Sequence, residues 1–215
     1  MKRIHTIAAV LAGGITALAG LGYLYQFLAD RRDRKLYPPP GPLIPTEGHC
    51  LHCFCQGKGS PTVVLEGGLG CNHLTWSRVL PEIAKFTQVI AYDRAGTGWS
   101  SPLTTPRTGR QMAADLHALL RQSGIHGPLI LVGHSYGGPL VRLYASQYPD
   151  EVAGLVLVDA SHEDQKAHAP REKSRLKRIQ AEINWQWYRT RPLRARLGLL
   201  RLFARPRQED FAQLP

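Results

Sequence analysis

The sequence predicts an α/β fold, a mostly parallel sheet with helices on both faces, preceded by one amino-terminal transmembrane helix. Three observations predict it. Short apolar runs alternate with segments of helical periodicity, which is typical of a parallel sheet covered on both sides. A glycine-flanked serine lies between one such run and one such helix, within Val132–Gly138. Residues 7–28 carry no charged side chain.

The uncharged run 7–28 is long enough to cross about 30 Å of hydrocarbon as a helix. A cleaved signal peptide is the alternative, because Lys2 and Arg3 precede the run and Ala17-Leu18-Ala19 resembles a cleavage site. The run continues beyond Ala19 and ends in the basic segment 31–35, which favours an uncleaved single-pass anchor. Two basic residues precede the run and four follow it, so the positive-inside rule leans slightly towards a cytosolic domain.

The chain divides into four predicted segments. Residues 1–35 form the membrane anchor with its basic flanks, and the proline-rich stretch 36–45 is a linker, because a run of prolines is a semi-rigid spacer. Residues 46–170 form the α/β core, and 171–215 a basic helical tail. With 215 residues and 43% apolar side chains, the chain can bury one ordinary core.

The net charge of +11 is concentrated at the two ends. Residues 1–35 carry six basic and two acidic side chains, and residues 171–207 carry twelve and two. Basic segments beside an anchor favour contact with an anionic membrane surface, and a solvated basic helix face is the alternative. Without zinc-finger spacing or an RNA-binding strand motif, we expect no nucleic-acid partner.

The elements of the core follow one another as strand, loop and helix. Strands are expected over 48–55, 62–65, 89–93, 129–132 and 152–159, and helices over 111–122 and 140–148. The run 152–159 is almost continuously apolar, which predicts a strand buried on both faces.

The four cysteines lie at positions 50, 53, 55 and 71. A four-ligand metal site needs a second Cys-x-x-Cys pair, which the sequence lacks, so we expect small apolar strand residues and neither a metal nor a cofactor. Four free thiols are compatible with a reducing compartment.

The segment Gly133-His134-Ser135-Tyr136-Gly137 has the pattern Gly-x-Ser-x-Gly. On a sharp turn between a strand and a helix, this pattern presents the serine hydroxyl at the tip of the sheet. The sequence therefore predicts that Ser135 is a nucleophile. His134, adjacent to it on the turn, is expected to pack or to hydrogen-bond.

Three motifs occur in order: Gly-His-Ser-Tyr-Gly-Gly, preceded by Tyr-Asp-Arg-Ala-Gly-Thr-Gly-Trp-Ser and followed by Leu-Val-Asp-Ala-Ser-His. Together, over residues 48–165, they resemble the α/β-hydrolase superfamily, most of all its serine esterase and lipase-like branch. The resemblance implies a Ser-His-acid hydrolase acting on a carboxylic ester or similar small acyl substrate. It also implies an oxyanion hole formed by the N–H of Tyr136 and that of either Gly68 or Leu69.

The region after the serine helix departs from the family. Asp159 is the candidate acid, with capping of the following turn as its alternative role, and His162 or His168 is the candidate base. No strand pattern follows Asp159, so we expect the family's last two strands and its histidine to be missing, and 171–207 to resemble the start of a cap. The alternative function is a catalytically silent hydrolase remnant or binding protein without the triad histidine.

Three further expectations concern the surroundings of the serine. Asp93-Arg94 is expected to be a structural ion pair or loop brace, and Trp76 and Trp99 to line an acyl pocket or pack in the core. If the last strands are missing, 152–159 becomes an exposed apolar edge that favours self-association.

Overall fold

The computed structural model describes residues 2–102, 106–165 and 174–203. These residues form two compact units. One unit spans 39–169 and contains the sheet, while the other combines the amino-terminal helix with the helices near the carboxyl terminus.

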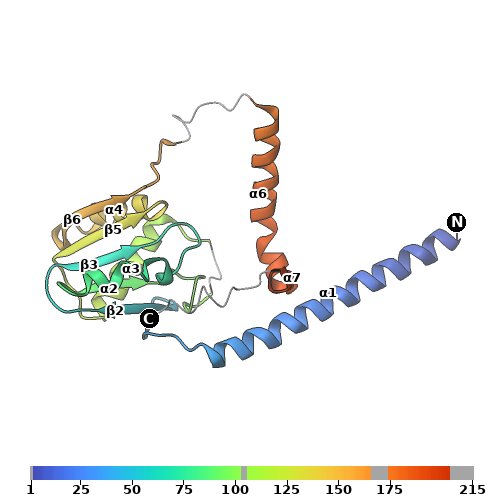
Figure 1. Cartoon of the computed structure of the whole chain (residues 1–215), viewed down its shortest axis with the longest axis horizontal. Coiled ribbons are helices and arrows are strands. Elements are labelled where there is room, and N and C mark those ends of the chain that lie inside the picture. Colours follow the sequence, from blue (N-terminus) through green and yellow to red (C-terminus); the bar gives the residue numbers. More distant parts are fainter. Residues whose placement is uncertain (1, 103–105, 166–173, 204–215) are drawn as a thin grey trace. The chain divides into compact units, whose positions relative to one another are not determined.

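The sheet has six strands in the order β1-β2-β4-β3-β5-β6 (Figure 1). Their bounds are Leu43–Thr46 for β1, His49–Gln56 for β2, Thr62–Glu66 for β3, Val89–Tyr92 for β4, Leu129–His134 for β5 and Val152–Val158 for β6. The pairs β1–β2 and β2–β4 are antiparallel, and β4, β3, β5 and β6 are parallel to one another. The predicted mostly parallel sheet is confirmed, and β1 adds an unpredicted strand that begins at Leu43, inside the segment 36–45 predicted as a linker.

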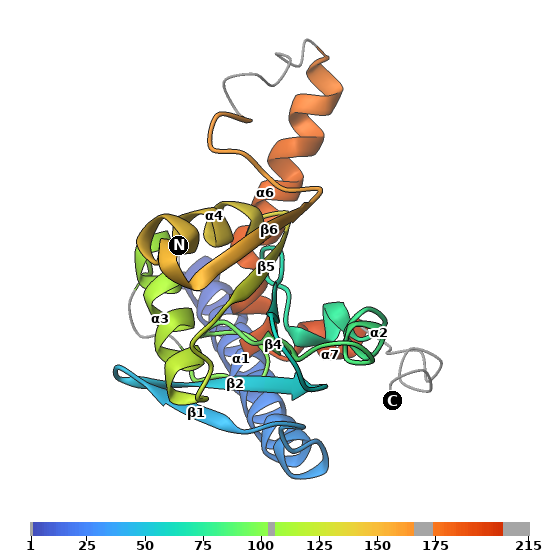
Figure 2. The ribbon, with the colours of Figure 1, turned by 90° about the vertical axis from the view of Figure 1, so that its left-hand side faces the viewer.

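Helices cover both faces of this sheet, as predicted (Figure 2). The helices are α3 (Gly109–Gln122) and α4 (Gly137–Gln147) on one face and the short α2 (Leu80–Ile83) on the other, with 3₁₀ turns at His73–Trp76 and Pro149–Glu151. Helix α3 begins earlier than expected, because the Thr108 hydroxyl accepts from the Gln111 N–H and the Gln111 side chain accepts from the Thr108 N–H.

Two apolar clusters hold these layers together. Beneath α3 and α4, residues such as Leu119 and Tyr144 pack on Val64 and Leu131. On the opposite face Trp76 and Leu80 pack on Val63 and Leu65. Because successive strand residues face opposite sides, β3 contributes to both clusters.

Strand β6 is the edge of the sheet, and the prediction that it is buried on both faces is wrong. Leu155, Val156, Leu157 and Val158 are between 40% and 50% exposed. Among the described residues, β6 pairs only with β5. The apolar composition of 152–159 is that of an interior strand. Its place in the described sheet is instead the exposed apolar edge that we expect if the family's last strands are missing.

The other unit contains three helices: α1 (Lys2–Leu36), α6 (Arg175–Arg196) and α7 (Leu199–Phe203). Within α1, Arg3–Leu36 is the one described segment long and apolar enough to span a membrane, a property that a signal sequence shares. Arg201 of α7 pairs with Asp30 at 2.8 Å and with Asp33 at 2.6 Å. The rest of the predicted tail 171–215 and His168 lie outside the described residues.

Candidate active site

Ser135 occupies the sharp turn between β5 and α4. Its φ is +50°, in the left-handed region that side chains with a Cβ avoid. The turn fits because its neighbours are small: a Cβ at Gly133 would lie 2.7 Å from the carbonyl oxygen of Gly137. The Ser135 N–H donates to the carbonyl of Val158, and the Ser135 carbonyl accepts from Ser161 N–H at 3.0 Å. The strained serine is thus held by β6 and by the loop after it.

The loop after β3 lies against this serine. A Cβ built on Gly68 would lie 3.4 Å from the Cβ of Ser135 and 3.2 Å from Nδ1 of His134. Tyr136 begins the first turn of α4, where the N–H groups have no acceptor within the helix. The structure therefore brings together Ser135, Tyr136 and the Gly68-Leu69 loop, the predicted nucleophile and oxyanion-hole residues.

Beneath the loop lies a buried network of Glu66, Tyr92 and Arg94. The Arg94 guanidinium forms an ion pair with Glu66 and donates to the carbonyl oxygens of Gly67, at 2.7 Å, and Gly68. The Tyr92 hydroxyl donates to the other carboxylate oxygen of Glu66. Burial and the adjacent Glu66 carboxylate raise the pKa of Tyr92 well above its ordinary value, so this hydroxyl stays a proton donor.

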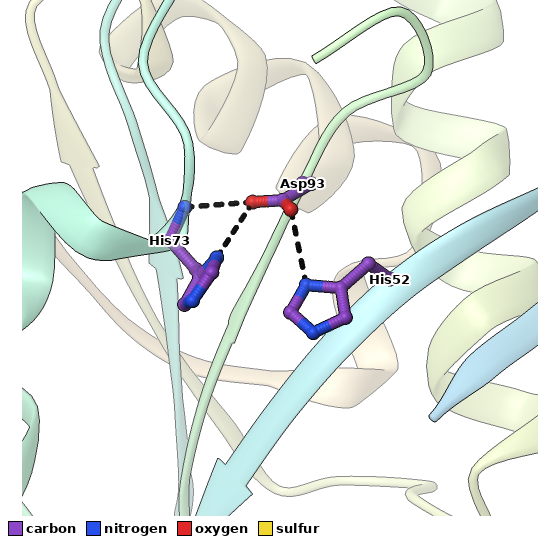
Figure 3. Close-up of side chains that lie close together, drawn as sticks. All are labelled: His52, His73 and Asp93. Carbon is purple, nitrogen blue, oxygen red and sulfur yellow. Dashed lines mark hydrogen bonds and ion pairs between the residues drawn. The ribbon is translucent and has the colours of Figure 1, made fainter. Parts of the chain in front are cut away.

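Asp93 makes no ion pair with Arg94, so of the two predicted roles only that of a loop brace fits. Figure 3 shows the rings of His52 and His73 turned towards its carboxylate, with Nδ1 distances of 3.0 and 2.9 Å. The backbone N–H groups of His73 and Trp99 also donate to it. Burial raises the pKa of Asp93, but these hydrogen bonds outweigh burial and bring the pKa below its ordinary value.

His52, His73 and Asp93 are also the group of described side chains whose ligand atoms lie close enough to hold a metal ion. Each carboxylate oxygen of Asp93 already accepts from two N–H groups. A cation would have to displace the imidazole donors from both oxygens. The arrangement is therefore that of a satisfied structural carboxylate, which joins β2, the turn at His73 and the loop at Trp99.

The candidate acid and base are not assembled around Ser135 in the described residues. Asp159 directly follows β6 with φ +43°, is exposed, and its carboxylate makes no hydrogen bond or ion pair within the described chain. Its alternative role, capping the turn at Ser161, is therefore not seen: the Ser161 N–H donates to the carbonyl of Ser135 instead. His162 is 54% exposed and its Nδ1 accepts from the N–H of Asp164. A triad histidine instead donates from Nδ1 to its acid.

A cavity of about 270 Å³ lies beside the two oxyanion-hole elements. Leu69 and Tyr136 form part of its wall, together with the apolar side chains of Leu51, Tyr92, Ala95 and Met112. An ion pair between Arg107 and Asp115 also lines it. The predicted wall residues are elsewhere: Trp76 is buried in the core against His134, and Trp99 packs on His52 and His73.

The cysteines are free thiols. Burial raises the pKa of Cys53 to about 12 and raises that of Cys55. Both therefore stay protonated at neutral pH, which fits apolar strand residues better than thiolate ligands.

The sequence patterns do not predict two parts of the site. The Glu66 network and the histidines around Asp93 were not expected, although a signal was present: Glu66, Tyr92 and Asp93 are polar residues at the carboxyl ends of apolar parallel strands. That end of a parallel sheet is where functional side chains collect.

These features define a class. Four parallel strands, a strained serine between strand and helix, and a glycine loop beside it are the parts of the α/β-hydrolase fold. The family model described as alpha/beta hydrolase fold matches residues 61–213. The chain therefore belongs to the α/β-hydrolase fold family.

Individual relatives match over part of their length. Lipase LipV of Mycobacterium tuberculosis is 38% identical over 113 residues, which are 51% of this chain and 41% of the lipase. The uncharacterized protein YqjL of Bacillus subtilis is 33% identical over 104 residues, 48% of this chain and 41% of YqjL. A solved thermophilic esterase from Thermogutta terrifontis is 29% identical with a TM-score of 0.51, covering 58% of this chain and 47% of the esterase. The chain thus spans less than half of each of these relatives.

Proposed function

We propose that this chain is a membrane-anchored serine hydrolase that cleaves a small carboxylic ester, or a similar acyl substrate, through Ser135. The observation that carries the proposal is the strained Ser135 turn, φ +50°, with Gly68 against its Cβ. Residues with strained backbone angles cluster at functional sites. The likeness to Lipase LipV and to the Thermogutta esterase supports an ester as the substrate class.

In the proposed reaction the Ser135 oxygen attacks the carbonyl carbon of the ester and its proton passes to a general base. The carbonyl electron pair moves to oxygen, where the N–H of Tyr136 and that of Gly68 or Leu69 stabilise the negative charge. The pair returns, the alcohol leaves with the proton, and an acyl-serine remains. Water then repeats the attack and releases the carboxylic acid.

The cavity supports a small substrate. Its volume of about 270 Å³ is slightly below that of usual small-molecule sites, which begin at about 300 Å³. Most of its wall is apolar, which suits a short acyl or alkyl group beside the oxyanion hole. Helix α1 supports the anchor, because its apolar side chains are exposed within the described structure and would face lipid.

Labelling by a fluorophosphonate probe tests the proposal on the full chain in detergent. An activated serine displaces fluoride from phosphorus and forms a stable serine–phosphorus bond. We expect labelling that Ser135→Ala abolishes and that Ser161→Ala, a serine on the neighbouring loop, leaves in place. The same preparation should hydrolyse p-nitrophenyl butyrate. A cooperatively folded chain that takes no label would overturn the proposal.

One observation favours the second candidate, a catalytically silent binding protein. In the described part of the chain no histidine is hydrogen-bonded to the Ser135 hydroxyl, and Nδ1 of His162 is an acceptor rather than a donor. Without a base the hydroxyl is a weak nucleophile. Labelling of the wild type separates the candidates, because a folded wild-type chain that takes no label is the silent protein. Asp159→Asn then tests the acid, since asparagine tolerates positive φ: a loss of labelling by about 10⁴-fold indicates a triad acid, and unchanged labelling excludes Asp159 from that role.

A further inference from the structure

We infer that Arg94 is a positioning residue that holds the oxyanion hole in its working geometry. The inference rests on the proposed function. Arg94 lies in the wall of the cavity, and the task assigned to it acts through the Gly67-Gly68 loop rather than on the reacting atoms. Three observations carry it: the carbonyls to which Arg94 donates, the burial of its counter-ion, and its place beside Tyr136.

The first observation concerns peptide geometry. In a trans peptide the C=O and the following N–H point in opposite directions. Arg94 donates to the carbonyls of Gly67 and Gly68, and the N–H groups of those same peptides belong to Gly68 and Leu69. Both candidate oxyanion donors are therefore turned away from Arg94. The loop that carries them lies beside the serine, since a Cβ built on Gly68 would lie 3.4 Å from the Cβ of Ser135.

The two peptides differ in how firmly other groups hold them. The Gly68 carbonyl also accepts from the N–H of Cys71, at 3.2 Å, within the loop's own turn. Among the described residues, Arg94 is the donor to the Gly67 carbonyl. Glycine adopts many backbone conformations, so nothing intrinsic to Gly67-Gly68 fixes this peptide. Arg94 thus controls above all the orientation of the Gly68 N–H.

The second and third observations explain why an arginine fits here. Glu66 is 1% exposed and holds the guanidinium by an ion pair, while Tyr92 holds Glu66. The guanidinium carbon lies 5.9 Å from the ring centre of Tyr136, the residue that carries the other oxyanion donor. The planar fork of arginine reaches a carboxylate and two carbonyls together, whereas lysine offers a single point charge.

The substitution Arg94→Lys is the informative variant, because it keeps the charge beside Glu66 and removes the fork. A merely structural ion pair would be rescued by lysine, whereas a positioned loop would not. We expect the labelling rate of Ser135 and kcat for p-nitrophenyl butyrate to fall by about tenfold to a hundredfold, with KM within about twofold, because the loss of one oxyanion donor lowers kcat by about 10²–10³. Arg110→Gln, which removes an exposed arginine, is the control.

Hydrogen–deuterium exchange of the segment Gly67–Cys71 supplies a readout that needs no activity. In Arg94→Lys and Arg94→Gln this segment should exchange at least about tenfold faster, while β3 and β5 stay unchanged, because local opening follows local hydrogen bonds. Unchanged exchange of this loop in folded Arg94→Lys overturns the inference. If wild type takes no label, the proposed function fails, and the exchange result still decides whether Arg94 orients the loop.

Discussion

At the scale of single residues, Ser135 and Asp159 are the two described non-glycine residues with positive φ, and they lie at the ends of adjacent strands. The left-handed region costs an ordinary L-residue about 1–2 kcal/mol. The fold retains this strain because β6 and the Ser161 loop bind both backbone groups of Ser135. The strain is a property of the backbone and is independent of the hydroxyl.

We therefore expect Ser135→Gly to be more stable than Ser135→Ala by about 1 kcal/mol, since glycine adopts positive φ without strain. Urea unfolding of both variants followed by tryptophan fluorescence measures the difference. The same pair of changes at Ser161, whose φ is not positive, is the control and should favour alanine. Equal stabilities of the two Ser135 variants would contradict a strained turn.

Asp93 gives a prediction about pH. Its pKa is lowered in the folded state, so its contribution to stability is complete above the ordinary carboxyl pKa of about 4 and is lost as the pH falls through the lower folded value. Asp93→Asn places an amide N–H among four N–H donors, so it should cost about 3 kcal/mol at neutral pH. That cost should shrink in strong acid, where the wild type also loses its carboxylate.

Chemical unfolding at neutral pH and below about pH 3 tests this expectation, with the exposed Asp150→Asn as control. A cost for Asp93→Asn that is the same at both pH values would show that the ionised carboxylate contributes no stability. A cost near zero at neutral pH would show that the brace is not needed.

At the scale of elements, the sequence predicts those structures that depend on residues close together in the chain. The Ser135 turn needs only Gly133, Gly137 and the flanking apolar periodicity, and the sequence predicts the end of β5 to within two residues and the start of α4 to within three. The Asp93 brace and the Arg94 network join residues 41 and 28 positions apart. Which strand ends become neighbours depends on strand order, and hydrophobic patterning does not specify that order.

Strand β6 carries a prediction about association. Its exposed apolar residues, and an edge that no strand in the described ranges pairs with, form a template for another strand. We expect the chain to self-associate in detergent and Val156→Lys to shift it towards the monomer by sedimentation velocity. Val79→Lys, with 44% exposure against 47% for Val156, is the matched control away from the edge. A wild-type monomer would refute this expectation.

Helix α3 contributes Met112 to the cavity wall, which makes the substrate size testable. Met112→Trp fills part of the volume of about 270 Å³, whereas Met112→Leu nearly conserves side-chain volume. We expect Met112→Trp to lower hydrolysis of p-nitrophenyl butyrate by about tenfold or more, because removing one methylene's space costs about 1–3 kcal/mol, and to leave the acetate ester almost unaffected. Equal losses for both esters would show that the acyl group binds elsewhere.

At the scale of the whole molecule, α1 carries the prediction that the chain is anchored in a membrane. We expect the expressed chain to remain in the membrane pellet after alkaline carbonate extraction and its amino-terminal sequence to begin ahead of Ala19, because the apolar run continues past that residue. A chain that begins after Ala19 and is released by carbonate would identify a signal peptide. The cytosolic side stays the prediction for the domain, from the basic residues that flank the apolar run.

The helices of the unit without the sheet, which are α1, α6 and α7, come from opposite ends of the sequence. Arg201 binds Gln26 and Asp30, residues 175 and 171 positions away, and Gly198 packs against Tyr25. In topological terms the core is an insertion in the sequence between α1 and the two helices, α6 and α7, that contact α1. A single proteolytic cut in the proline segment 38–42 would therefore leave the core covalently attached to the helices that pack on α1. A soluble fragment of the core has to omit both ends, since removing α1 alone uncovers the surfaces of Leu197 and Gly198 that α1 now contacts.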